Sequence, residues 1–171
     1  MKSPKIIAVR IVLVILTALV MIFIYRMSAM DAENSSQLST SVGYTVGQVV
    51  VEGFDELPSE VQGEYVESIE HPLRKLAHFT EFTALGFLLI FDILVFCRLN
   101  GAKRFLISLI IGLLYATSDE IHQIVVSGRS CEFKDVMIDT GGVLTGCVIA
   151  SIIISVIHHI KYRYDHAPDN E

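Results

Sequence analysis

The chain has 171 residues, of which 52% are hydrophobic and 19% are charged, with a formal net charge of −6. This composition excludes a disordered chain, which would be poor in apolar residues and rich in charge. The acidic balance argues against a general nucleic-acid binder, which would carry a basic surplus. We therefore expect a single domain over residues 1–171 with no nucleic-acid partner. Three cysteines without a CxxC pair predict neither a disulfide framework nor a structural zinc knot.

The apolar residues are concentrated in four blocks, at about 6–25, 76–97, 105–123 and 136–157. A bilayer core is about 30 Å thick and is crossed by about 20 helical residues. The third block reaches that length only if the polar stretch 118–123 is part of the helix. A helix satisfies all its backbone groups within one segment, and none of the blocks alternates like a membrane strand. The sequence thus predicts an all-α integral membrane bundle of four transmembrane helices.

Basic residues mark one side of this bundle. They are Lys2, Lys5 and Arg10 before or within the first block, Arg98, Lys103 and Arg104 after the second, and Lys161 and Arg163 after the fourth. Short cytoplasmic flanks carry the surplus of Lys and Arg, so both termini are predicted to be cytoplasmic. The first block also has the make-up of a signal peptide. We expect an uncleaved anchor because no small-x-small cleavage site follows it.

The segment 26–74 is predicted to be an external acidic loop. Its middle, VGYTVGQVVVEGF, has a periodicity compatible with a short amphipathic helix on the membrane surface. The segment has too few large apolar residues for a core of its own. We therefore expect a mobile surface loop with one or two helical turns.

Polar side chains gather near the outer ends of three predicted helices. At helical spacing, Arg74, His78 and Glu81 share one face of the second helix, and Asp119 and Gln123 share one face of the third. Glu120 points elsewhere, and we expect it to face a second helix. The candidate ligand-binding residues are Arg74, Lys75, His78, Glu81, Asp119, Glu120, Gln123, Arg129, Asp135 and Asp139. The plain alternative is a salt-bridge network that fixes the register of the helices.

The last helix begins with Asp135 and Asp139 on the same stripe as Gly142 and Gly146. Two glycines four residues apart allow a neighbouring helix to approach closely. If that neighbour belongs to the same chain, the two carboxylates are drawn into the bundle. The other possibility is a homodimer through Gly142 and Gly146.

A metal ion and a cofactor are not expected from the sequence. His, Asp and Glu residues are present, but there is no HExxH motif or other close pair of histidines. Four basic residues in the same cluster, including Arg129 and Lys134, would repel a cation. No GxSxG elbow and no glycine-rich phosphate loop is present either.

Two long motifs, HPLRKLAHFTEFTALG and SDEIHQIVVSGRSCEFKDVMIDTGGVLTG, resemble the VanZ-like family of small bacterial membrane proteins. The resemblance extends over about residues 26–150. Family positions are matched by Lys75, His78, Glu81, Asp119, Glu120, Gln123, Gly128, Arg129, Asp135, Gly142 and Gly146. The chain departs from the pattern at Phe82, Ser127 and Asp139, where many members carry tyrosine, proline and asparagine.

The resemblance implies a multi-pass protein of the bacterial plasma membrane. The family's namesake is associated with resistance to teicoplanin, a lipid-bearing glycopeptide antibiotic, and the family has no agreed reaction. We expect a protein that binds or shields a lipid-linked envelope ligand or a lipoglycopeptide antibiotic among the membrane lipids, with Arg74, Lys75 and Arg129 contacting its acidic group.

The main alternative is a membrane enzyme that modifies a lipid headgroup or a cell-wall precursor. In that case Asp119, Glu120 or Asp135 would be the general base, His78 or His122 its proton partner, and Arg129 would stabilise developing charge. A small carrier is a third possibility, but the inner halves of the first, third and fourth predicted helices are almost purely apolar and offer no polar path.

Overall fold

The computed structural model describes residues 4–129 and 131–166. Within these ranges the chain forms five α-helices, one short 3₁₀ helix and no strand. They are α1 (Pro4–Ser28), α2 (Ala32–Val50), η1 (Phe54–Glu56), α3 (Ser59–Phe96), α4 (Gly101–Gln123) and α5 (Phe133–Asp165). Of these described helices, four are long and apolar enough to cross a membrane, namely α1, α3, α4 and α5. The predicted all-α class and the four candidate spans are confirmed.

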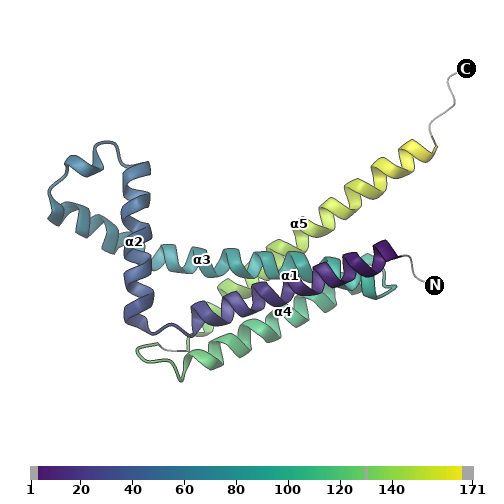
Figure 1. Cartoon of the computed structure of the whole chain (residues 1–171), viewed down its shortest axis with the longest axis horizontal. Coiled ribbons are helices and arrows are strands. Elements are labelled where there is room, and N and C mark those ends of the chain that lie inside the picture. Colours follow the sequence, from purple (N-terminus) through teal and green to yellow (C-terminus); the bar gives the residue numbers. More distant parts are fainter. Residues whose placement is uncertain (1–3, 130, 167–171) are drawn as a thin grey trace, which may run out of the picture.

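The four long helices run along a common direction, with α3 in the middle of the bundle (Figure 1). α3 packs mainly against α5 and also contacts α1, α2 and α4. The bundle core is apolar and includes Phe82, Leu85, Ile90 and Val143, each no more than 1% exposed. α1 and α4 end where α5 begins, at the end of the bundle opposite the two termini. The polar ends of three helices therefore meet in one place.

The contact between α3 and α5 is close because glycines lie along it. A Cβ atom on Gly146 would lie 2.0 Å from the carbonyl oxygen of Thr83, and one on Gly142 would lie 2.4 Å from that of Phe79. On the α3 side, a Cβ on Gly86 would lie 2.2 Å from the carbonyl oxygen of Val143. Of the two uses predicted for the glycine stripe, the chain thus shows the one within the monomer. A homodimer stays a prediction.

The predicted mobile loop over residues 26–74 is wrong. These residues form α2, η1 and the first part of α3, which begins at Ser59 and not near residue 76. α2 begins at its N-cap Asp31, whose side chain accepts a hydrogen bond of 2.8 Å from the backbone N–H of Asn34. α2 lies across the direction of the bundle (Figure 1).

Small residues explain how this segment folds with few large apolar ones. Phe54 is 2% exposed and fills the space beside Gly47, where a Cβ would lie 2.6 Å from its ring. Val66 of α3 is equally buried beside Gly43 of α2. Two large side chains against two glycines thus form a small second core outside the main bundle.

α4 contains the polar stretch 118–123, as predicted, and it reaches its full length only by including it. The other three spans are also longer than the predicted blocks. For example, α5 begins at Phe133 and continues to Asp165.

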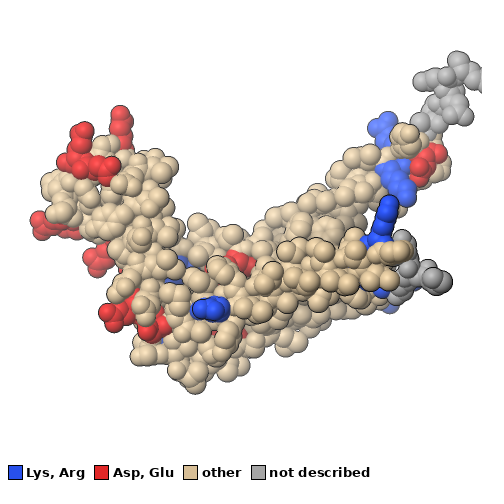
Figure 2. Space-filling model, viewed as in Figure 1, with Lys and Arg blue, Asp and Glu red and all other residues tan. Residues whose placement is uncertain are grey.

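The charged residues are unevenly distributed along the molecule (Figure 2). Acidic residues gather around α2 and the start of α3, whereas basic residues lie near the two termini and, in smaller number, beside the junction of α1 and α2.

Candidate functional site

The structure brings the ten predicted site residues together at the end of the bundle opposite the termini. Four of them are almost fully buried: Asp119 is 4% exposed, Glu120 1%, Gln123 6% and Asp139 2%. Such burial is unusual for acidic residues, which are mostly exposed unless they have a partner. The partners of each carboxylate therefore decide what the site can do.

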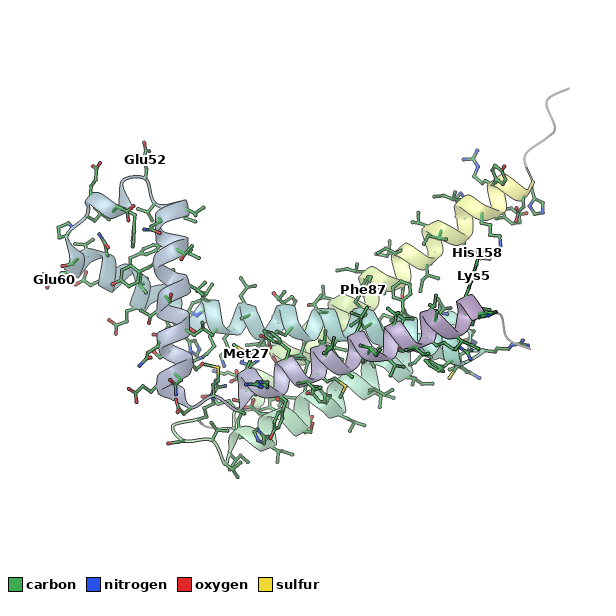
Figure 3. The ribbon with its side chains drawn as sticks, in the orientation of Figure 1. Lys5, Met27, Glu52, Glu60, Phe87 and His158 are labelled. Atoms are coloured by element: carbon green, nitrogen blue, oxygen red, sulfur yellow. The ribbon has the colours of Figure 1, made fainter. Side chains whose placement is uncertain are left out.

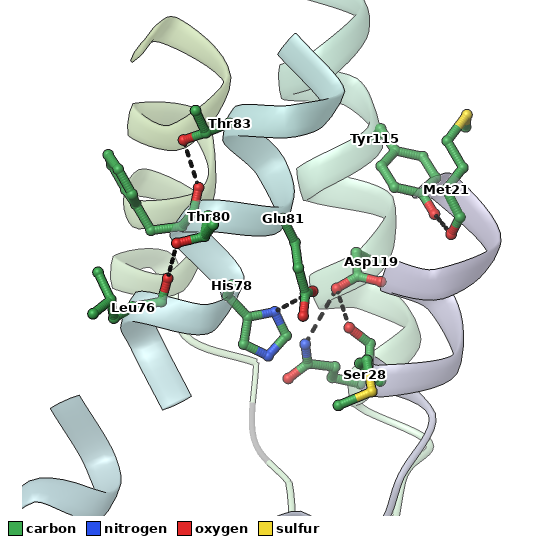
Figure 4. A network of polar contacts seen from close by, with 12 residues as sticks. Met21, Ser28, Leu76, His78, Thr80, Glu81, Thr83, Tyr115 and Asp119 are labelled. Carbon is green, nitrogen blue, oxygen red and sulfur yellow. Dashed lines mark hydrogen bonds and ion pairs between the residues drawn. The ribbon is translucent and has the colours of Figure 1, made fainter. Parts of the chain in front are cut away.

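Asp119 on α4 is held from two directions (Figure 4). Its Oδ2 accepts a hydrogen bond of 2.6 Å from the Ser28 hydroxyl of α1 and one of 3.3 Å from the side-chain amide of Gln123. Ser28 was not among the predicted site residues. A single serine at the end of an apolar block carries little signal, although it lies where the first helix must end.

Glu120 points away from Asp119, as its position on the helix predicts. Its Oε1 accepts a hydrogen bond of 2.7 Å from the backbone N–H of Glu132, directly before α5. Its Oε2 is buried and has no hydrogen-bond partner in the described part of the chain. Glu120 thus fixes the entry to α5 with one oxygen and leaves the other unsatisfied.

Lys75 and Asp135 form an ion pair between α3 and the first turn of α5. Arg74 lies 3.9 Å from the carboxylate of Glu70 and 3.2 Å from the ring of His71, both on its own helix. Two of the predicted anion-binding residues, Lys75 and Arg74, therefore already interact with a carboxylate. The ion pair of Lys75 with Asp135 is closer than that of Arg74 with Glu70.

His78, Glu81 and Asp139 face the same interior space but are poorly satisfied. The Nδ1 atom of His78 lies 3.8 Å from Glu81 Oε2, which is too long for a hydrogen bond (Figure 4). The Nδ1 atom of His78 and the Oε2 atom of Glu81 are buried without a hydrogen-bond partner among the described residues, and no described residue bonds to the Asp139 carboxylate. A buried polar group without a partner is costly, so this arrangement calls for an explanation.

Arg129 reaches the site from the loop between α4 and α5. Its guanidinium donates to the backbone oxygen of Met27 at 3.4 Å. Gly128, with a φ of +74°, makes the turn before it. Burial lowers the pKa of Arg129, and the positive charge of Arg74 acts in the same direction. The carboxylates of Asp119, Glu120 and Asp135 act in the opposite direction on this pKa.

Two connected cavities lie at this end of the bundle. The first is an apolar groove of about 550 Å³ between α1, α2 and α3, lined by residues that include Phe23, Leu38, Val42, Leu76 and Ala84. The second is a polar pocket of about 140 Å³ lined by Lys75, Glu120, Asp135 and Asp139, among others. Arg74, His78 and Arg129 line both cavities, so the groove and the pocket adjoin at these residues.

His122, considered above as a proton partner, lies elsewhere. Its ring centre is 4.7 Å from that of Tyr25, and it lines neither cavity. Of the two predicted proton partners, only His78 faces the polar pocket.

The fold and the site define a multi-pass α-helical membrane protein with a buried polar cluster at one end of its bundle. A family model described as VanZ/LLP1 matches residues 13–154, and the chain belongs to this family. The resemblance of the two sequence motifs is thereby confirmed. No match was found among the curated proteins or the solved structures.

Proposed function

We propose that this protein binds an amphiphile with an anionic head and a hydrocarbon tail at the outer face of a bacterial plasma membrane. Lipid-linked envelope precursors and lipoglycopeptides such as teicoplanin belong to this class. One observation carries the proposal: an apolar groove and a polar pocket adjoin at Arg74, His78 and Arg129. An amphiphile needs two such compartments side by side.

The groove has the size and lining expected of a site for the tail. Its volume of about 550 Å³ lies within the range of about 300–1,000 Å³ that is common for small-molecule pockets. Phe23 of α1, Leu38 of α2 and Leu76 of α3 contribute to its walls, and all three side chains are exposed. A tail seated there would cover apolar surface that α1, α2 and α3 leave open.

Arg74 and Arg129 are the best candidates for contact with the head. Both guanidinium groups border the groove and the pocket, so an anion held where the two cavities adjoin can contact both. Guanidinium suits the planar oxygens of a phosphate or carboxylate. Lys75 takes an indirect role because Asp135 already occupies its ammonium group.

The outward orientation rests on the distribution of charge. Most of the basic residues lie near the termini and between α3 and α4, which supports a cytoplasmic location for those ends. The groove and the pocket then face the outer leaflet, where lipid-linked precursors and antibiotics of this class are met.

The test is binding of a fluorescent single-chain lysophosphatidic acid to the purified full chain in detergent, followed by fluorescence anisotropy. Charge-assisted hydrogen bonds contribute about 1.5–3 kcal/mol, so Arg129→Gln should weaken binding at least tenfold. Ala84→Phe, which fills the groove, should weaken it as well. Non-saturable binding, or equal binding by all variants, would overturn the proposal.

Two matched controls separate the site from general effects. Arg26→Gln removes a charge from an exposed residue at the end of α1 that lines neither cavity. Leu114→Phe enlarges an exposed side chain on α4, away from the groove. Both should bind the probe within twofold of the wild type. Cells that express Arg129→Gln or Ala84→Phe should be more susceptible to teicoplanin than cells that express the wild type or either control. Deacylated teicoplanin, which lacks the tail, should not distinguish the variants.

A second candidate function is an acid–base reaction on the head of the same amphiphile. It is favoured by His78 and Asp139, which face the polar pocket without hydrogen-bond partners among the described residues. A carboxylate and an imidazole in one pocket suit proton transfer. Mass spectrometry of envelope lipids from wild-type cells, a deletion strain and an Asp139→Asn strain tests this. A covalent difference in one species, lost equally in both altered strains, would identify an enzyme.

A further inference from the structure

We propose that His78, Asp119 and Asp139 form a binding site for one divalent transition-metal ion. The site goes beyond the proposed function, because an amphiphile can bind without a metal and metal binding can be measured without an amphiphile. Each residue comes from a different membrane-spanning helix: α3, α4 and α5 respectively. A metal ion there would join the three helices beside the polar pocket, which His78 and Asp139 line.

The distances suit a metal ion. Each residue offers one ligand atom, and the three atoms lie within 4.8 Å of one another. Metal–ligand bonds of about 2.0–2.2 Å place two ligands at most about 4.4 Å apart. Side-chain movements of a few tenths of an ångström therefore complete the site, without displacement of any helix.

Asp139 gives the independent reason to expect a ligand. It is 2% exposed and lines the pocket beside His78. Among the residues that the structure describes, none forms a hydrogen bond or ion pair with its carboxylate. An unpaired carboxylate in such a position is costly, and coordination to a cation compensates it. No such explanation is needed for Asp135, which Lys75 neutralises.

Asp119 is already held in the orientation of a metal ligand. Both of its hydrogen bonds, from Ser28 and Gln123, end on Oδ2. Oδ1 accepts no hydrogen bond within the described ranges and is free to bind a cation. Metal-binding carboxylates are commonly oriented by such outer hydrogen bonds.

The objection from neighbouring bases loses force in the structure. Lys75 pairs with Asp135, Arg74 lies beside Glu70, and Lys134 is exposed, so Arg129, which lines the pocket with His78, is the basic group that remains close to the site. Against these stand the further acids Glu81 and Glu120, each with a buried oxygen that lacks a hydrogen-bond partner among the described residues. The interior of the cluster therefore carries more acidic than basic groups, which favours a cation.

The donor set indicates the kind of metal. One imidazole nitrogen and two carboxylate oxygens suit Zn²⁺, Mn²⁺ or Fe²⁺ better than Ca²⁺ or Mg²⁺, which take oxygen ligands. Three protein ligands leave at least one coordination position open, as in catalytic zinc sites. The adjoining pocket of about 140 Å³ has room for a small group at that position.

The experiment uses the purified full chain in detergent, stripped of metal with a chelator. Zn²⁺ is titrated by calorimetry, and Co²⁺ is followed by its visible absorption. We expect one equivalent of each, with binding at least tenfold weaker in His78→Asn and Asp139→Asn. The matched control is Asp92→Asn. Asp92 is also a carboxylate on α3, but it accepts a hydrogen bond of 2.6 Å from Thr17 near the other end of the bundle. This variant should bind metal like the wild type.

Several results would overturn the site. They are no saturable binding by the wild type, or unchanged binding by a His78→Asn or Asp139→Asn variant that circular dichroism shows to be folded. If these variants do not fold, X-ray absorption of the zinc-loaded wild type decides instead. A first shell without an imidazole nitrogen contradicts the proposal. Probe binding measured in parallel with and without chelator keeps a failure of the metal site distinct from a failure of amphiphile binding.

Discussion

The hydroxyl of Ser28, at the last residue of α1, donates a hydrogen bond of 2.6 Å to the carboxylate of Asp119 on α4. Ser28 is 0% exposed and Asp119 is 4% exposed. The two residues are far apart in the sequence, and few other contacts join their helices. This bond therefore ties the first helix to the polar cluster.

Replacement of Ser28 by alanine should destabilise the protein. The change leaves a buried carboxylate with one hydrogen bond fewer, which costs about 1.5–3 kcal/mol for a charged acceptor. Thermal unfolding in detergent measures the loss. Ser118→Ala is the control, because Ser118 is exposed and its hydroxyl bonds only to the backbone of Tyr115. Equal melting temperatures for the two variants would contradict the role of Ser28.

Alanine at Gly146 should separate α3 from α5. The new Cβ would lie 2.0 Å from the Thr83 carbonyl oxygen, which is backbone and cannot turn aside. Overpacking of this kind costs about 1–3 kcal/mol or more. Gly63→Ala should instead stabilise the protein by about 0.5–1 kcal/mol, since Gly63 lies within α3 with nothing within 4 Å of the new atom. The free energy of unfolding, measured for both variants in the same detergent, should fall for Gly146→Ala and rise for Gly63→Ala. A fall or a rise in both would contradict this account.

The ion pair between Lys75 and Asp135 should appear as a coupling energy. Each side chain is 21% exposed, so the pair lies between a surface ion pair and a fully buried one. We expect a double-mutant cycle with Lys75→Met and Asp135→Asn to give a coupling of about 1 kcal/mol. Strictly additive effects of the two changes on the free energy of unfolding would argue that the pair contributes nothing to the joining of α3 and α5.

Two native cysteines can report the orientation in the membrane. Cys97 follows α3 and Cys131 precedes α5, at opposite ends of the bundle, and both are exposed. With the termini in the cytoplasm, a membrane-impermeant maleimide should label Cys131 in intact cells and Cys97 only after permeabilisation. Cys131→Ser and Cys97→Ser variants assign the signals. The reverse order of labelling would invert the topology.

The spans were predictable because lipid imposes a strong and local rule. About 20 apolar residues in one segment form a helix in a bilayer whatever surrounds them, and each of the four blocks lies in a helix long enough to cross it. Members of the polar cluster could also be predicted from the sequence, since helical spacing puts Arg74, His78 and Glu81 on one face of α3. These inferences depend on neighbours in the sequence alone.

The segment before α3 shows where that reasoning fails. Its helices depend on Phe54 against Gly47 and on Val66 against Gly43, contacts that a count of large apolar residues does not detect. A helix in water is stabilised mostly by what its apolar face packs against. The periodicity of VGYTVGQVVVEGF therefore predicted only a short helix, and the full length of α2 depends on its packing against α3.

The sequence by itself determined the family, the four candidate spans and the identity of the clustered polar residues. Only the tertiary structure decided their pairing: Lys75 with Asp135, Ser28 with Asp119, and His78 beside Asp139, which has no hydrogen-bond partner among the described residues. It also decided that an apolar groove adjoins the polar pocket. The physical reason is that helical periodicity fixes the face of each side chain, whereas the rotation and depth of one helix against another depend on contacts such as Gly146 against Thr83.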